Sequence, residues 1–95
     1  MSYSGEIVSM AIRREESLMV REIDGELLVL DMRSDQIHQL NRTAAFIWRM
    51  CDERATLQAI AAALACEFMV DEETALEDVA KTLSLLQHLH LLVSG

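Results

Sequence analysis

Residues 35–48 read DQIHQLNRTAAFIW, and this stretch joins a short strand directly to a helix. Gln36–Leu40 has the mixed polarity of a strand at a sheet edge, and Asn41 is a favourable N-cap for the helix that begins at Arg42. The sequence before this stretch has strand patterns, and the sequence after it has helical patterns. An edge strand carries unpaired backbone N–H and C=O groups, so Gln36–Leu40 can accept a further strand. We predict that this open edge is the functional site.

A β-hairpin precedes the edge strand. The turn Asp24-Gly25 separates Leu18–Ile23 from Glu26–Met32, and this dipeptide suits a type I′ turn because both central residues need a positive φ. Residues 27–30 are all apolar, which predicts a central strand covered on both faces. With the edge strand as its third member, the sequence predicts a three-stranded antiparallel sheet.

Three amphipathic helices follow. The first is expected over residues 42 to about 52, the second begins after the N-cap Thr56, and the third runs from 72 to about 90 after the N-cap Asp71. The core residues expected in the first two helices are Ala44, Ala45, Ile47, Trp48, Cys51, Leu57, Ile60, Ala61, Leu64 and Phe68. The predicted fold class is therefore α+β, a three-stranded antiparallel β-sheet followed by three α-helices in a winged helix-turn-helix-like order.

The third helix carries two neighbouring apolar stripes. The first consists of Leu76, Val79, Leu83 and Leu86, and it is enough to bury the helix against a core. The second consists of Leu85, Leu89 and Leu92, extended upstream by Thr82 and Asp78. This second stripe is compatible with a deeper core, a dimer contact or one wall of a groove.

The first seventeen residues stand apart from this plan. Val8, Met10 and Ile12 alternate with Ser9, Ala11 and Arg13, which is the period of a half-buried strand. We expect residues 1–17 to form an additional strand or an arm that docks on a neighbouring molecule. Residues 18–95 are expected to form the folded domain.

Composition limits the classes of function. A chain of 95 residues fits one domain, and its net charge of −8 disfavours nucleic acid, which is bound mainly through Lys and Arg. No apolar run reaches the roughly 20 residues of a membrane span, and no signal peptide is evident. Cys51 and Cys66 are expected to be buried free thiols in a reducing cytoplasm.

The chain offers no recognisable catalytic or metal-binding constellation. His88 and His90 are two residues apart, so they point to different faces of a helix, and His38 stands alone. The two cysteines lack a C-x-x-C spacing, and the three glycines are isolated, so a phosphate-binding loop is not expected. We therefore expect a protein that is not an enzyme and that needs no cofactor.

The arrangement of caps and core residues resembles the PqqD family. The resemblance rests on Asp24-Gly25, on Gln39-Leu40-Asn41-x-Thr43-Ala44-Ala45-x-Ile47-Trp48, and on the spacing of Thr56, Ile60, Ala61, Leu64, Asp78, Val79, Leu83, Leu86, Leu91 and Leu92. It covers roughly residues 18–93. The family usually has a Gly where this chain has His90 at the end of the third helix.

The resemblance implies a peptide-recognition element of a ribosomally synthesised, post-translationally modified peptide pathway. The leader region of a precursor peptide would lie between the third strand and the third helix and would be presented to a modifying enzyme, such as a radical SAM protein, a cyclase or a protease. Addition of a peptide strand to a sheet edge supplies affinity through main-chain hydrogen bonds and specificity through alternate side chains. The expected peptide-binding residues are Gln36, Ile37, His38, Gln39 and Leu40 at the edge, Thr82, Leu85 and Leu89 in the wall, and Asp78 and Lys81 at the rim.

Two other classes remain open from the sequence. In a winged-helix DNA-binding protein the third helix would read the major groove, but Asp71, Glu72, Glu73, Glu77 and Asp78 would meet phosphate there. In an oligomeric module a second copy of the chain would cap the open edge, which is compatible with a homodimer.

Overall fold

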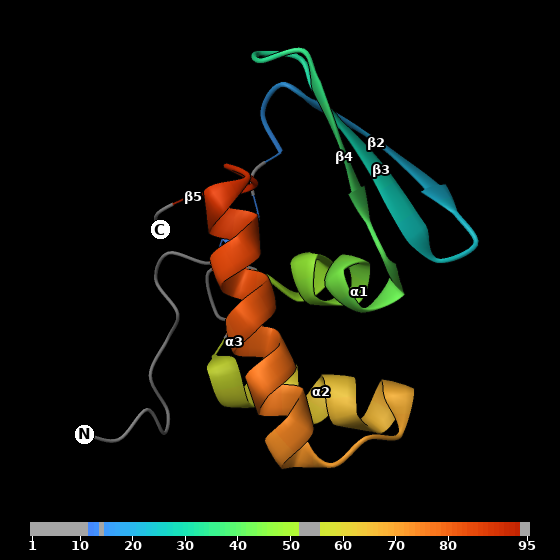
Figure 1. Cartoon of the computed structure of the whole chain (residues 1–95), viewed down its shortest axis with the longest axis vertical. Helices are drawn as coiled ribbons and strands as arrows, with labels where there is room; N and C mark the ends of the chain where they lie inside the picture. Colours follow the sequence, from blue (N-terminus) through green and yellow to red (C-terminus); the bar gives the residue numbers. More distant parts are fainter. Residues whose placement is uncertain (1–11, 14, 52–55, 94–95) are drawn as a thin grey trace.

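The computed structural model of the chain describes residues 12–13, 15–51 and 56–93. A three-stranded sheet is followed by three helices, and a separate two-stranded ladder joins the two ends of the described chain (Figure 1). The elements in chain order are β1 (Ile12–Arg13), β2 (Leu18–Ile23), β3 (Glu26–Asp31), β4 (Gln36–Leu40), α1 (Arg42–Met50), α2 (Leu57–Phe68), α3 (Glu72–His88) and β5 (Leu92–Val93). The predicted α+β fold class is confirmed.

The sheet is an antiparallel meander in the order β2-β3-β4. Its hairpin turn has the predicted positive φ values, 54° at Asp24 and 86° at Gly25. The positive φ at Gly25 favours glycine, and a Cβ atom there would lie 3.2 Å from Cγ of Arg42, a tight contact that would push the arginine side chain aside. Nε of Arg42 also donates to the carbonyl of Asp24 at 3.0 Å, and this bond ties the turn to the start of α1.

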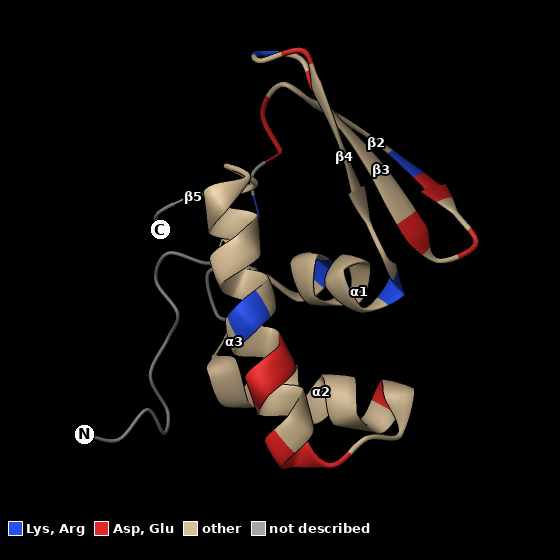
Figure 2. Cartoon of the chain, in the orientation of Figure 1, with Lys and Arg blue, Asp and Glu red and all other residues tan. Residues whose placement is uncertain are grey.

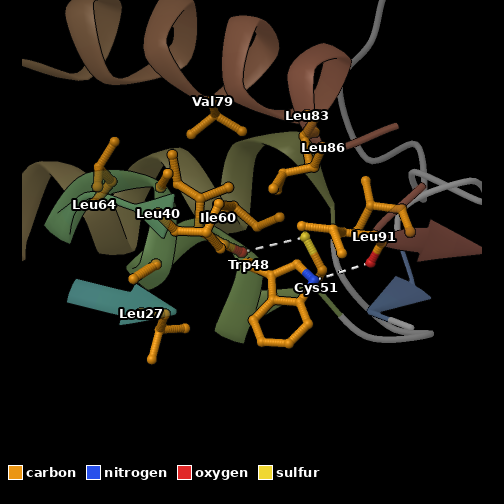
Figure 3. Packing of buried hydrophobic residues seen from close by; sticks show 14 of the residues in the cluster. Leu27, Leu40, Trp48, Cys51, Ile60, Leu64, Val79, Leu83, Leu86 and Leu91 are labelled. Atoms are coloured by element: carbon orange, nitrogen blue, oxygen red, sulfur yellow. Dashed lines mark hydrogen bonds between the residues drawn. The ribbon is translucent and has the colours of Figure 1, made fainter. Parts of the chain in front are cut away.

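The first helix is the middle layer of the domain. It contacts β3 and β4 on one side, and α2 and α3 on another. Figure 3 shows Val79 and Leu86 of α3 pointing toward Leu40 and Ile60, with Leu27 on the side away from α3. The five residues expected on the buried side of α1 are all buried: Ala44, Ala45, Ile47, Trp48 and Cys51. One contiguous hydrophobic core therefore joins the inner face of the sheet to all three helices.

The three predicted N-caps are confirmed. The side chains of Asn41, Thr56 and Asp71 accept hydrogen bonds from the backbone N–H groups of Ala44, Ala59 and Thr74 at 2.9, 3.0 and 2.9 Å. Each bond satisfies one of the N–H groups that lack an intrahelical partner in the first turn of a helix. These residues therefore fix where the three helices begin.

The third helix ends two residues earlier than predicted, at His88. The N–H of His90 donates to the carbonyl of Gln87 at 3.0 Å, and the N–H of Leu91 donates to the carbonyl of Leu86 at 2.9 Å. This is a Schellman motif, in which the position after the cap is left-handed and is usually glycine. His90 occupies that position with a φ of 62°. The motif therefore forms although its glycine is missing.

The first helix also ends early, at Met50 rather than near residue 52, which lies outside the described residues. Cys51 is its cap, and its N–H donates to the carbonyl of Trp48 at 3.1 Å. The two cysteines are free, as expected, but only Cys51 is buried and Cys66 is exposed.

Besides Cys66, two further burial predictions were wrong. Leu76 was expected in the buried stripe of α3, but it is exposed, and Ala75 lies in the core instead. Residues 27–30 were expected to be covered on both faces. Leu27 and Val29 are buried, whereas Leu28 is 36% exposed on the opposite face. The helices therefore cover only one face of the sheet.

A short clasp joins the two ends of the described chain. Ile12 pairs with Val93 and Arg13 pairs with Leu92, so these two residues form a short strand, and the role of residues 1–17 as an additional strand or a docking arm stays a prediction. The N–H of Arg13 donates to the carbonyl of Cys51 at 3.2 Å. Nε1 of Trp48 donates to the buried carbonyl of Leu91 at 2.9 Å, as Figure 3 shows. The clasp therefore anchors on the end of α1. The other positions of the predicted alternation, Val8 and Met10, lie outside the described residues.

Candidate functional site

The three-stranded sheet has two edges, β2 and β4, and they differ in charge. The strand β2 carries Arg21 and Glu22, and Glu22 forms an ion pair with Arg49 of α1. The strand β4, whose sequence is QIHQL, has no charged residue. Charged side chains on an edge strand are a common device against pairing with another chain. Of the two edges, β4 is therefore the less protected against pairing with a further strand.

The register identifies which backbone groups of β4 face outward. The two-residue turn makes Ile23 and Glu26 a hydrogen-bonded pair, and the bond from Met32 N–H to the Ser17 carbonyl, 2.9 Å, agrees with this alternation. Alternate residues of β3, namely 27, 29 and 31, therefore bond to β4, where their partners are residues 40, 38 and 36. The N–H and C=O groups of Ile37 and Gln39 are left pointing away from the sheet.

The side chains of β4 alternate between the two faces. His38 pairs with the buried Val29 and is half-buried on the inner face, and Leu40 is only 1% exposed. Gln36 shares their face but is exposed. Ile37 is 70% exposed on the outer face. The side chain of Leu40 is thus part of the core, so that residue can contribute to a bound strand only through its backbone.

Gln39 is also exposed on the outer face. Its Nε2 donates to Oε1 of Glu26 at 3.0 Å. This bond holds the side chain along the sheet toward β3 and leaves the outward-pointing backbone of Gln39 uncovered by its own side chain.

The predicted residues of α3 lie along a strip beside the buried stripe. Asp78, Thr82 and Leu89 are half-buried, Leu85 is 49% exposed, and Lys81 is exposed. Leu89 packs against the core cluster. The strip therefore combines an apolar C-terminal half with a polar N-terminal half.

The two halves of the predicted site come from opposite sides of α1. Figure 1 shows α3 standing beside the sheet, and α1 contacts both. The strand β4 and the helix α3 do not pack closely against each other. The backbone of β4 is thus free of α3, and the assignment of these residues to one peptide groove stays a prediction.

Sequence reasoning missed an apolar surface on the outer face of the sheet. Met19 of β2, Leu30 of β3 and Ile37 of β4 are cross-strand neighbours. The shallow pocket at this face is lined by Met19, Val20, Arg21, Leu28, Leu30 and Ile37. The continuous apolar run 27–30 contained the signal, but such a run does not distinguish a covered face from an exposed one.

The surface of α3 is acidic over its first half (Figure 2). Hydrogen bonds from the side chain and the backbone N–H of Thr74 lower the pKa of the N-cap Asp71, so this carboxylate stays charged at neutral pH. Lys81 is the single Lys or Arg residue of the helix. This surface repels phosphate, so the DNA-binding alternative gains no support.

Other kinds of site find no support in the described part of the chain. No group of three or more His, Cys, Asp or Glu side chains among the described residues could hold a metal ion. No helix within the same residues has the length and apolar character that crossing a bilayer requires.

Comparison with known proteins agrees with the fold. The structure of TbiB1 in complex with the TbiA(beta) leader peptide shares 23% identity over 85% of this chain and 94% of its own, with a TM-score of 0.72. The structure of lasso peptide synthetase B1 complexed with the leader peptide shares 26% identity over 90% and 99%, with a TM-score of 0.72. No curated protein sequence matches the chain. The profile of the family described as coenzyme PQQ synthesis protein D (PqqD) matches residues 26–92, and the chain therefore belongs to the PqqD family.

Proposed function

We propose that this protein is a non-catalytic recognition element that binds the leader region of a ribosomally made precursor peptide. The peptide adds to β4 as a fourth strand, and the complex is presented to a modifying enzyme. The same role is suggested by the two structural relatives, both of which were solved with leader peptides. The site is predicted to be completed by the α3 strip of Asp78, Lys81, Thr82, Leu85 and Leu89.

The observation that carries this proposal is the edge of β4, which has no Lys, Arg, Asp or Glu and pairs with no further strand in the described part of the chain. Ile37 and Gln39 offer two N–H donors and two C=O acceptors in an extended arrangement. A peptide that pairs with them gains main-chain hydrogen bonds without regard to its sequence. Its alternate side chains then contact either the inner or the outer face of the sheet, and these contacts would select one peptide from others.

The enzyme that receives the peptide is proposed to be a separate protein. A radical SAM enzyme, a cyclase or a protease fits the family, and the cytoplasm, where the precursor is synthesised, is the proposed location. The PQQ pathway and other peptide pathways are both compatible with this role.

An NMR titration tests the proposal directly. The probes are the TbiA(beta) leader peptide and synthetic peptides covering the N-terminal regions of short precursor reading frames next to the chain's gene. At least one peptide should shift the backbone amides of Ile37 and Gln39 and should protect them from hydrogen exchange. Binding that shifts only β2, or only the clasp of β1 and β5, would contradict the proposed site.

Two controls address the alternatives. Duplex DNA should give no salt-dependent shift of α3 resonances, since the surface of that helix is acidic. Sedimentation with and without the peptide distinguishes a peptide-filled edge from one filled by a second copy. If a homodimer forms through β4, the peptide should dissociate it.

A further inference from the structure

Among the inner-face residues of the open strand, His38 has an unsatisfied polar atom. Its Nε2 is buried and has no hydrogen-bond partner among the described residues. A buried polar group without a partner costs about 1–3 kcal/mol. Such a cost calls for an explanation, because most buried polar groups in folded proteins are hydrogen-bonded.

The register places His38 in the centre of the proposed interface. Its own N–H and C=O groups are directed to Val29 of β3, and the outward-pointing groups belong to its neighbours Ile37 and Gln39. A peptide that pairs with both neighbours puts one of its residues directly opposite His38. For a peptide that runs antiparallel to β4, as the proposal requires, this is a non-hydrogen-bonded pair, in which the two Cα atoms are only about 4.5 Å apart and the side chains share one face.

We infer that His38 is a specificity-determining residue that hydrogen-bonds, through Nε2, to an uncharged polar side chain of the bound peptide. This inference rests on the proposed function. On binding, the imidazole rotates about its side-chain bonds toward the peptide strand. Nε2, which has no hydrogen-bond partner in the free protein, then bonds to the polar side chain of the peptide. Binding of the correct peptide therefore removes a cost that the free protein carries.

The chemical class of the peptide side chain follows from charge and burial. A carboxylate would lose its hydration at the inner face and would meet a chain of net charge −8. An ammonium or guanidinium group is a donor only and would also lose hydration there. A hydroxyl or amide both donates and accepts, so it can pair with Nε2 whether or not that nitrogen carries a hydrogen. The peptide residue opposite His38 is therefore Ser, Thr, Asn or Gln.

Two matched variants test the inference. His38→Phe keeps a flat ring but removes the nitrogen, and His38→Gln places an amide nitrogen near the position of Nε2. With a peptide that binds the unmodified protein in the titration above, His38→Phe should weaken affinity about three- to tenfold, whereas His38→Gln should stay within about twofold. In the free protein, His38→Phe should leave the melting temperature unchanged or raise it, because it deletes an unpaired polar atom. A purely structural histidine would lose stability instead.

A substitution series in the peptide completes the test. Replacing each Ser, Thr, Asn or Gln of the peptide by Ala should identify one position whose loss weakens binding to the unmodified protein and has no effect on the His38→Phe variant. If every position has the same effect on both proteins, or if His38→Phe binds as well as the unmodified protein, the inference is wrong while the proposed function stands. If no peptide binds the unmodified protein, the proposed function itself fails.

Discussion

Proline at Ile37 offers the sharpest test of the proposed edge. The N–H of Ile37 points away from β3, and its side chain is 70% exposed. Proline is tolerated at edge strands where the N–H faces solvent, so Ile37→Pro should cost the free protein less than about 1 kcal/mol of unfolding free energy. Ile37→Thr keeps both the N–H and a β-branched side chain, and it is the matched control.

The same substitution should strongly impair peptide binding. It removes one main-chain donor, and the pyrrolidine ring occupies the space that the peptide carbonyl needs, which disturbs the adjacent bond as well. Two hydrogen bonds at about 0.5–1.5 kcal/mol each give a loss of about 1–3 kcal/mol, or roughly five- to 150-fold in affinity. Isothermal titration calorimetry with the binding leader peptide measures this loss, and urea unfolding measures the stability.

His38→Pro is the contrasting variant. The N–H of residue 38 belongs to the ladder between β3 and β4, so proline there deletes a ladder bond, leaves the Val29 carbonyl without its donor and should cost about 1–3 kcal/mol of unfolding free energy. Hydrogen exchange of the free protein provides an independent measurement: the amides of Ile37 and Gln39 should exchange quickly, and those of His38 and Leu40 slowly. The proposed edge is wrong if Ile37→Pro binds the peptide as tightly as Ile37→Thr does. It is also wrong if the amides of Ile37 and Gln39 exchange more slowly than those of His38 and Leu40.

Three further predictions concern the scaffold. Trp48→Phe leaves the buried Leu91 carbonyl without its donor and removes ring volume, so it should lower the unfolding free energy by about 2–4 kcal/mol in urea titrations; an unchanged midpoint would show that the bond contributes nothing. His90→Gly relieves a positive φ and should raise the unfolding free energy by about 0.5–1 kcal/mol in the same titrations; a fall in stability would contradict the assignment of strain to His90. The lowered pKa of Asp71 means that its stabilising effect is complete above its ordinary pKa, near pH 4, and is lost as pH falls through the folded-state value. Asp71→Asn keeps a capping side chain that does not titrate, so its stability should decline less steeply in acid unfolding curves; parallel curves would contradict this assignment.

The features that could be predicted from the sequence are set by local chemistry. Asp24-Gly25 determines its turn through backbone sterics, and Asn41, Thr56 and Asp71 determine helix starts through bonds that span three residues. None of these features depends on distant parts of the chain. The order of strands and helices followed from them.

The features that could not be predicted depend on how elements pack. Whether Leu28 is covered depends on the number of layers around the sheet, and whether Leu76 or Ala75 enters the core depends on the rotation of α3. The outward-facing backbone of Ile37 and Gln39 requires the strand register. The end of α3 was misplaced because His90 takes a backbone conformation that usually belongs to glycine.

The lack of charge on β4 has a consequence for the life of the protein in a cell. An edge strand without charged side chains can pair with any extended polypeptide, including nascent chains and copies of itself, because main-chain hydrogen bonding does not depend on sequence. Discrimination must then come from fast dissociation of non-cognate peptides rather than from slow association. Unwanted strand pairing is limited when the concentration of peptide-free protein is low. Synthesis of the protein together with its peptide would keep that concentration low.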